Sequence, residues 1–253
     1  MQLKSYAILF TTMKKGPVKL IQAALTERLH MDPRKNPVRV AVEDNCVVME
    51  GVVDGIALKK RALLIAMSMK DVEGVIDRLK VRPSMNMTDA EIQAHIYNAF
   101  AEDPALACLK VETAGAVVDL EGTVTSLTHK RLAGTLAWWV PGVADVINSI
   151  EVVPPEEDSD DEVVDAVKLV LEKDPIVHLG SINVSAANWI VTLSGAAPGE
   201  TEKIAAEEDA LYVWGVNEVV NAIAVLRPAA RPAAKEIFPA RPYRPHRLPL
   251  KKP

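Results

Sequence analysis

The histidines and cysteines of this sequence are the side chains best suited to metal binding or nucleophilic chemistry, and their spacing supports neither. No two of the five histidines have the separation of a helical metal pair or of a zinc-finger pair. Cys46 and Cys108 form no metal-ligand spacing, no disulfide framework and no cysteine–histidine arrangement. The glycine patterns of nucleophile elbows, phosphate-binding loops and dinucleotide-binding turns are also absent. The sequence therefore predicts a protein that is not an enzyme and has no catalytic residue, cofactor or metal site.

Electrostatic binding is the other chemistry that the sequence offers. The net charge of -5 argues against a dedicated nucleic-acid-binding protein. Seven prolines and eight Lys or Arg residues in 227–253 predict an extended, disordered basic tail. Its candidate binding residues are Arg241, Tyr243, Arg244, Arg247, Lys251 and Lys252. Three alternatives stay open: a solvated tail without a partner, attachment to anionic lipid headgroups at about 1 kcal/mol per basic residue, and binding to nucleic acid or to an acidic protein patch.

The chain contains an internal repeat of about seventy residues. Asp-Pro steps begin at positions 32, 103 and 174, so they are evenly spaced. Glycines recur at positions 51, 122 and 195. The first two glycines have the same separation as the Asp-Pro steps, but the last two are separated by two more residues. The third unit therefore has a two-residue insertion between its Asp-Pro step and its glycine. Because several such anchors recur in the same order, we interpret the sequence as three copies of one unit.

Each unit predicts the same order of elements: helix, strand, strand, helix, strand. The first helices are expected at 18–29, 89–101 and 162–172, and the Asp-Pro steps end them because a residue before proline avoids the helical region. Val118 and Leu120 alternate with Asp119 and Glu121, which indicates a sheet with one apolar and one polar face. Alanine pairs four residues apart let each second helix pack closely on that apolar face.

These features resemble BON domains, a bacterial module. The similarity is carried by VDLEG at 118–122, by the stretch from Gly142 to Val152, and by matching stretches at 191–195 and 215–225. The first unit departs from the pattern, with Met49 in place of the strand leucine and Asp71 in place of the loop glycine. The resemblance implies an αββαβ fold and a non-catalytic binding module, in a family associated with phospholipid surfaces, envelope stress and, in one branch, potassium sensing.

The aromatic residues near the ends of the second helices are the candidate binding residues of the folded part. Trp138 aligns with apolar residues in the other units and is expected in the core. Trp139, Tyr212 and Trp214 fall at positions that are mostly polar in the other units, so we expect them to be exposed. Such side chains suit a membrane interface or a partner's pocket, and packing between adjacent units is the alternative.

The outer sheet face of the third unit is also a candidate contact surface. It carries Thr192, Ser194, Ala222 and Ala224, whereas the second unit has charged residues on the same face. We therefore expect the third unit to pack this face on a neighbouring unit or on a second copy of the chain.

Together these patterns predict an α+β protein of three tandem αββαβ domains, each a small mixed sheet covered by two helices on one face. The expected limits are an N-terminal segment at 1–16, domain 1 at 17–83, domain 2 at 84–154, an acidic linker with domain 3 at 155–227, and the tail at 228–253.

The predicted function is that of a non-catalytic binding or scaffold protein at a phospholipid surface or in a stress-related assembly. The alternative is a sensor of a small ligand or of a cation such as potassium, whose domains rearrange on binding. The sequence shows neither a transmembrane segment nor a convincing signal peptide, and the two cysteines suit a reducing compartment. We therefore expect a cytoplasmic protein, with a peripheral membrane or periplasmic location as the alternative.

Overall fold

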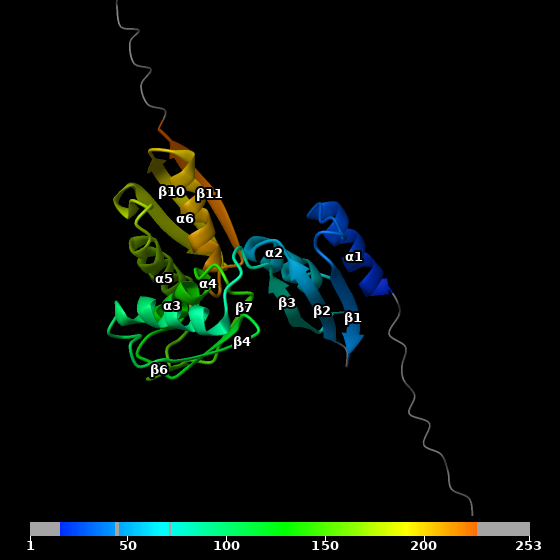
Figure 1. Cartoon of the computed structure of the whole chain (residues 1–253). Coiled ribbons are helices and arrows are strands. Elements are labelled where there is room, and N and C mark those ends of the chain that lie inside the picture. Colours follow the sequence, from blue (N-terminus) through cyan, green and yellow to red (C-terminus); the bar gives the residue numbers. More distant parts are fainter. Residues whose placement is uncertain (1–15, 44–45, 71, 227–253) are drawn as a thin grey trace, which may run out of the picture.

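The structure is a computed structural model that describes residues 16–43, 46–70 and 72–226. Figure 1 shows three small bodies along the chain, coloured blue to cyan, green, and yellow to orange. Domain 1 consists of α1 (Gly16–Arg28), β1 (Val38–Glu43), β2 (Cys46–Val53), α2 (Ile56–Met67) and β3 (Gly74–Val81). Domain 2 consists of α3 (Asp89–Ala101), β4 (Lys110–Ala114), β5 (Val117–Glu121), β6 (Thr123–Val124), α4 (Leu127–Trp138), β7 (Asp145–Asn148) and β8 (Glu151–Val152). Domain 3 consists of α5 (Asp160–Lys173), the 3-10 turn η1 (Leu179–Ser181), β9 (Ile182–Ala187), β10 (Ile190–Ala197), α6 (Glu200–Tyr212) and β11 (Glu218–Val225).

All three domains have the same sheet topology. The sheets have the strand orders β1-β2-β3, β4-β5-β7 and β11-β10-β9, so the middle strand always pairs with both others. The first two strands form an antiparallel hairpin, and the strand that follows the second helix pairs in parallel with the middle strand. In domain 2, β6 and β8 form a short parallel pair that continues this sheet past Gly122. The α+β fold of three αββαβ units is therefore confirmed.

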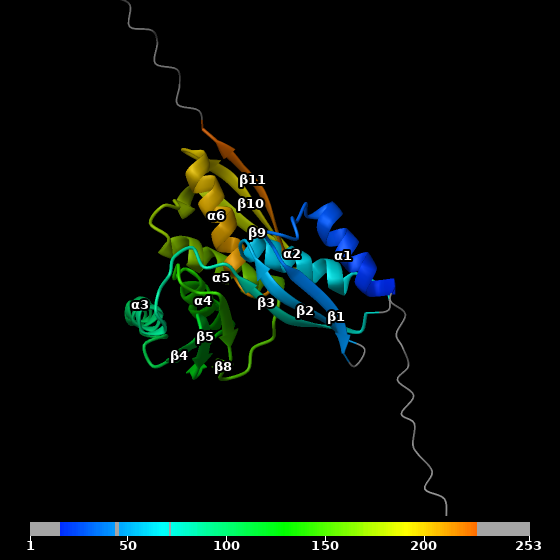
Figure 2. The ribbon, with the colours of Figure 1, turned by 45° about the vertical axis from the view of Figure 1, so that its right-hand side comes forward.

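The helices pack on one face of each sheet, as Figure 2 shows. Val118 and Leu120 are fully buried on this face, as the alternation predicts. The alanine pairs of the second helices lie against it and are all fully buried: Ala62, Ala66, Ala133, Ala137, Ala206 and Ala210. The buried apolar residues of the three domains form one contiguous cluster, so the domains are packed against one another.

The three Asp-Pro steps have the same local structure. In each, the aspartate Oδ1 accepts a hydrogen bond from the backbone N–H two residues later: Arg34 to Asp32 at 2.9 Å, Ala105 to Asp103 at 3.1 Å, and Ile176 to Asp174 at 2.8 Å. A short aspartate side chain that bonds its own backbone forms a turn, and the proline cannot continue a helix. Each step therefore turns the chain from the first helix toward the first strand.

The repeated glycine has a positive φ in every unit and close neighbours that leave no room for a side chain. Gly195 has a φ of +115°, and a Cβ atom there would lie 2.2 Å from the carbonyl oxygen of Ser181. Gly51 has a φ of +148°, and its Cβ would lie 2.0 Å from the carbonyl oxygen of Pro37. Gly122 has a φ of +130°, and its Cβ would lie 2.9 Å from a side-chain carbon of Leu109. The strained φ explains why this position is glycine in every unit.

Side chains at the start of the first helices fix the neighbouring hairpins. Thr88 and Glu91 form the complete capping box that their spacing predicts. Asp89 accepts hydrogen bonds from the backbone N–H groups of Gly115 and Ala116, which lower the pKa of its carboxyl group. The equivalent Asp160 accepts from Asn188 and Trp189 in the hairpin of domain 3.

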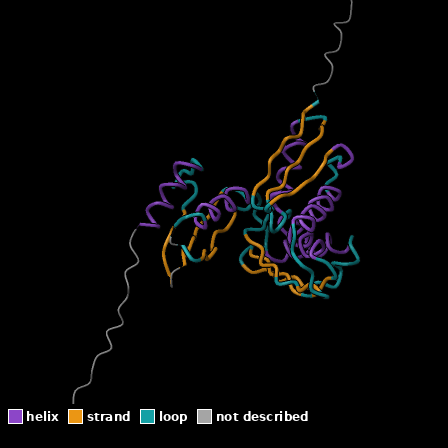
Figure 3. The backbone as a smooth tube through the Cα atoms, turned by 180° about the vertical axis from the view of Figure 1, so that it is seen from behind, coloured by secondary structure: helices purple, strands orange, loops and turns teal. Residues whose placement is uncertain are grey.

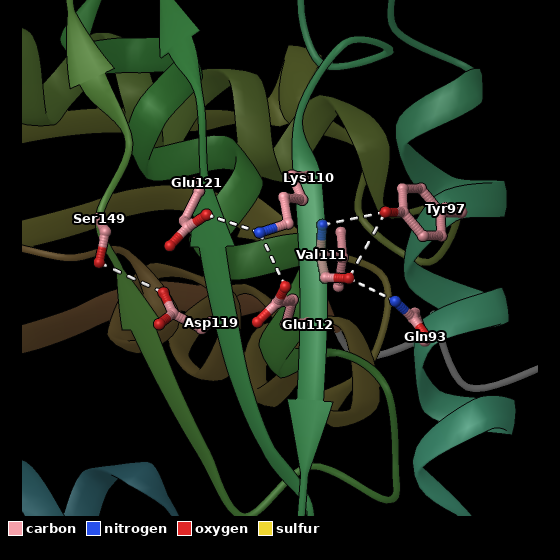
Figure 4. Close-up of polar contacts among 8 residues, drawn as sticks. All are labelled: Gln93, Tyr97, Lys110, Val111, Glu112, Asp119, Glu121 and Ser149. Carbon is pink, nitrogen blue, oxygen red and sulfur yellow. Dashed lines mark hydrogen bonds and ion pairs between the residues drawn. The ribbon is translucent and has the colours of Figure 1, made fainter.

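The outer sheet face of domain 2 is charged, and its edge strand is protected. Figure 4 shows the Lys110 ammonium group between the carboxylates of Glu112 and Glu121, at N···O distances of 2.7 and 3.0 Å. These two carboxylates raise the pKa of the lysine.

Helix α3 covers the edge of strand β4. The Tyr97 hydroxyl of α3 accepts from the backbone N–H of Val111 at 3.1 Å, and the Gln93 side chain donates to the carbonyl of Val111. The backbone N–H and carbonyl of Val111 on edge strand β4 are thus satisfied within the domain.

The three domains meet near the middle of the molecule. In Figure 3, which is the view from behind, domain 1 stands on the left and touches the other two domains in the centre. Helix α6 contacts both α2 and α4, and α5 packs on α4. The link between domains 1 and 2 is hydrogen bonded as well, from Val81 N–H to the Ala144 carbonyl at 2.7 Å and from Ser84 N–H to the Pro141 carbonyl at 2.9 Å.

Candidate functional site: the junction of the three domains

The turn that follows α6 is held by one cation from each of the other domains. Lys60 of α2 donates to the carbonyls of Val213 and Val216, at 2.9 and 2.7 Å. Arg131 of α4 donates from Nε to the carbonyl of Trp214 at 3.0 Å. Carbonyls at the C-terminal end of a helix are free and carry the negative end of its dipole, so cations stabilise them. We call residues 213–216 the clamped turn.

Lys60 and Arg131 occupy the same position in their repeats. With the insertion of the third unit allowed for, the third copy of this position is Ile204, which is exposed. Arg131 has no solvent exposure, its second guanidinium nitrogen contacts Asp158, and its charge lies 5.7 Å from the centre of the Trp214 ring. Burial lowers the pKa of Lys60 to about 7, while the two carbonyls that it contacts favour the charged form.

Lys59 joins domains 1 and 2 on the same side. Its ammonium group lies 3.1 Å from Asp77 in β3 and 2.7 Å from Asp145 in β7, and its side chain is 7% exposed. The ammonium group also lies 5.8 Å from the ring centre of Trp138. A buried charge that loses its partner is strongly unfavourable, so this pair fixes the relative position of the two domains.

A cavity of about 410 Å³ opens where the domains converge, and we call it the junction pocket. Domain 1 contributes residues around Gly55 and Arg82, domain 2 contributes 138–143, and domain 3 contributes the ends of α5 and α6. Trp138, Trp139 and Tyr212 form one side of it, which we call the aromatic wall. The rings of Trp138 and Tyr212 are 6.2 Å apart, and both also line a second cavity of about 390 Å³ that contains Lys59 and Lys60.

The junction pocket contains a carboxylic acid with a raised pKa. The pKa of Asp209 is raised from 3.8 to about 8, mainly by burial and then by the neighbouring carboxylate of Asp174. The indole N–H of Trp139 acts in the opposite direction, although it lies outside ordinary hydrogen-bond geometry. Asp209 is therefore neutral near pH 7.

The aromatic residues singled out from the sequence gather at this junction, but their exposure differs from the expectation. Trp138, expected in the core, and Trp139 and Tyr212, expected at the surface, are all half-buried. Only Trp214 is exposed as expected, at 57%. The alignment of the units compares positions within one domain, so it does not register contacts that exist only between domains. The basic residues from Arg241 to Lys252 lie outside the described residues.

The sheet face of domain 3 is not covered by another domain of the chain. Val220, Ala222 and Ala224 are exposed there, so the prediction that this face packs on a neighbouring unit is wrong. Packing of this face on a second copy of the chain stays a prediction.

Among the described residues, no group of three or more His, Cys, Asp or Glu side chains could hold a metal ion. In that same part of the chain, no helix is long and apolar enough to cross a membrane.

The charged residues of the junction are not identified as site residues by the sequence patterns. They are Lys59, Lys60, Arg131, Asp174 and Asp209, of which only Asp174 is part of a recognised pattern, the Asp-Pro step. The sequence does contain one pattern that points to Lys60 and Arg131. A basic residue recurs at this repeat position in the first two units, whereas the third unit has an isoleucine there.

The fold and the junction define a protein of three tandem αββαβ domains that are docked around one pocket. The BON domain matches the chain three times, at residues 18–83, 88–154 and 159–227. The chain therefore belongs to the BON domain family.

Osmotically-inducible protein Y of Escherichia coli (strain K12) is 29% identical over 142 residues, which are 52% of this chain and 68% of that protein. The C-terminal domain of CdsD, from the type III secretion system of Chlamydia trachomatis, is 15% identical with a TM-score of 0.24, and the match covers 85% of this chain and all of that domain. The PrgH periplasmic domain is 13% identical with a TM-score of 0.23, over 75% of this chain and 95% of that domain. These TM-scores are too low to support any argument.

Proposed function

We propose that this chain is a non-catalytic, stress-related binding protein whose three domains close around a small ligand at the junction pocket. The observation that carries the proposal is that every domain contributes to this one pocket. Ligand sites form preferentially at domain interfaces, where few polar groups converge on a largely apolar cavity. The similarity to an osmotically inducible protein supports a role under osmotic stress.

A scaffold that contacts a protein partner or a second copy is the second candidate. It is favoured by the outer sheet face of domain 3, where Ile190 and Val220 are exposed beside small uncharged residues. For attachment to anionic phospholipid, Trp214 is the one exposed residue of the three aromatic candidates, because Trp139 and Tyr212 are half-buried at the junction.

A matched pair of alanine-to-tryptophan variants separates the two candidates. Ala205→Trp places a large ring in the junction pocket, whereas Ala222→Trp places one on the exposed sheet face. Each variant is expressed in cells that lack the protein, and growth after osmotic shock is measured at matched protein levels. If the ligand proposal holds, Ala205→Trp fails to restore growth and Ala222→Trp restores it; the reverse pattern supports the scaffold.

The compartment stays a prediction, with the cytoplasm expected from the sequence and the periplasm as the alternative. Cell fractionation with a marker for each compartment distinguishes them. A periplasmic location would place the junction pocket in contact with external solutes, which suits a protein that responds to osmotic conditions.

A further inference from the structure

The junction pocket contains a polar atom that no described residue satisfies. Asp209 is 6% exposed, and its Oδ2 atom has no hydrogen-bond partner among residues 16–43, 46–70 and 72–226. The Nε1 atom of Trp139, on the wall of the same pocket, is likewise buried without a partner in the described structure. Buried polar groups are nearly always hydrogen bonded, so an exception that lines a cavity indicates a missing ligand group.

Most of the ionisable side chains around this pocket are acidic. Asp174 at the end of α5 and Glu208 and Asp209 on α6 all line it, and Asp209 adds a second negative charge to the Asp174 pair once it loses its proton. The cation of the lining is Arg82, and its guanidinium group is already bonded to Asp54 at 2.8 Å and to the Lys35 carbonyl at 2.6 Å in domain 1. The remaining titratable group that faces the pocket, the Tyr212 hydroxyl, has a pKa raised by burial and stays neutral. The pocket therefore favours a cation.

The rest of the lining selects an organic cation. The aromatic wall attracts cations through the faces of its rings and packs against alkyl groups. The carboxyl groups of Asp174 and Asp209 both line the pocket, and Asp174 lies near enough to raise the pKa of Asp209, so the two form a pair of acceptors for the N–H groups of a primary ammonium ion. Two carboxylates are too few to replace the hydration shell of a metal ion, and a volume of about 410 Å³ suits a small molecule.

We propose that the junction pocket binds a small primary alkylammonium ion, with its ammonium group on Asp174 and Asp209 and its alkyl chain against the aromatic wall. This inference rests on the proposed ligand-binding function and names the ligand class. Because binding needs Asp209 ionised, it releases a proton, and affinity rises up to tenfold per pH unit below the pKa of Asp209.

Calorimetric titration of the full chain with n-butylammonium chloride tests the proposal, at constant ionic strength. We use 1-butanol as the uncharged match and potassium chloride as the inorganic cation. We expect saturable binding of butylammonium that strengthens from about pH 6 to about pH 8. We expect no binding of 1-butanol, and no competition by potassium. Equal binding of 1-butanol, or displacement by potassium, would overturn the proposal.

Two variants and one control keep the result independent of folding. Asp209→Asn and Asp174→Asn are each expected to weaken butylammonium binding at least tenfold, and the pH dependence is lost in the first. Asp119→Asn removes a partly exposed carboxylate from the sheet face of domain 2, away from the junction pocket, and should leave binding unchanged. Unaltered binding to Asp209→Asn rejects the proposal. If butylammonium does not bind but Ala205→Trp still abolishes stress protection, the ligand class is wrong and the proposed function stands.

Discussion

Replacing Asp209 by Asn should make the protein more stable, and the gain should grow with pH. In the folded protein Asp209 is neutral up to about pH 8, whereas its usual value of 3.8 applies after unfolding. Between these values the folded state holds a proton that the unfolded state releases, so rising pH favours unfolding. The stability that the protonated Asp209 contributes is lost as pH rises toward its pKa in the folded protein. Asparagine cannot ionise, so the variant does not lose this stability.

The expected size follows from the pKa difference. Each pH unit inside the window costs about 1.4 kcal/mol, so the wild type should lose about 3 kcal/mol relative to Asp209→Asn between about pH 5 and about pH 7. The Asn side chain can still donate to Asp174, which keeps the two elements in contact. Asp174→Asn is a second variant, because removing the neighbouring carboxylate lowers the pKa of Asp209 in the folded protein and so lowers the upper end of the pH window.

Urea unfolding followed by tryptophan fluorescence at several pH values gives the two free energies. All other titrating groups are shared by the two proteins, so their difference isolates Asp209. Parallel stability profiles for wild type and variant would mean that Asp209 is ionised in the folded state, and the account of the buried proton would be refuted.

Three further substitutions test the junction and the repeat. Arg131→Met should cost about 3 kcal/mol of unfolding free energy because it removes a fully buried charge from its partners, whereas Arg61→Met on the exposed side of α2 should cost under about 0.5 kcal/mol; equal costs would contradict the clamp. Gly195→Ala should lower the melting temperature sharply and Gly199→Ala should not, because only the first has a positive φ and a backbone oxygen in the way. Lys59→Met should free domain 1, seen as a larger radius of gyration in X-ray scattering, while Lys80→Met on the exposed part of β3 should leave that radius unchanged.

The repeat could be predicted because its constraints act within one domain. The glycine at 51, 122 and 195 has a positive φ in every unit, and the Asp-Pro steps form a turn from neighbouring residues. Alternation along 118–121 reports which side of the sheet is buried, because that burial is decided by the domain's own helices. Such signals survive in a single sequence.

The junction could not be predicted because it depends on how the domains dock. Arg131 stands in a helix whose local pattern gives no reason to bury a guanidinium group, and its partner Trp214 belongs to another domain. Asp209 is one residue from the exposed Glu208, and its raised pKa arises mainly from burial, with Asp174 of the same domain as the next cause. The local sequence pattern does not indicate this burial. Trp139 and Tyr212 are half-buried at the junction, which the alignment of the units does not predict.

A double-mutant cycle on Lys60 and Arg131 tests most directly whether domains 1 and 2 hold the same turn of domain 3. The unfolding free energy is measured for the wild type, Lys60→Met, Arg131→Met and the double variant. Because either single change loosens the clamped turn, the double variant should lose at least about 1 kcal/mol less than the sum of the single losses. Losses that add to within about 0.5 kcal/mol would show that the two cations act independently, and would contradict a shared junction.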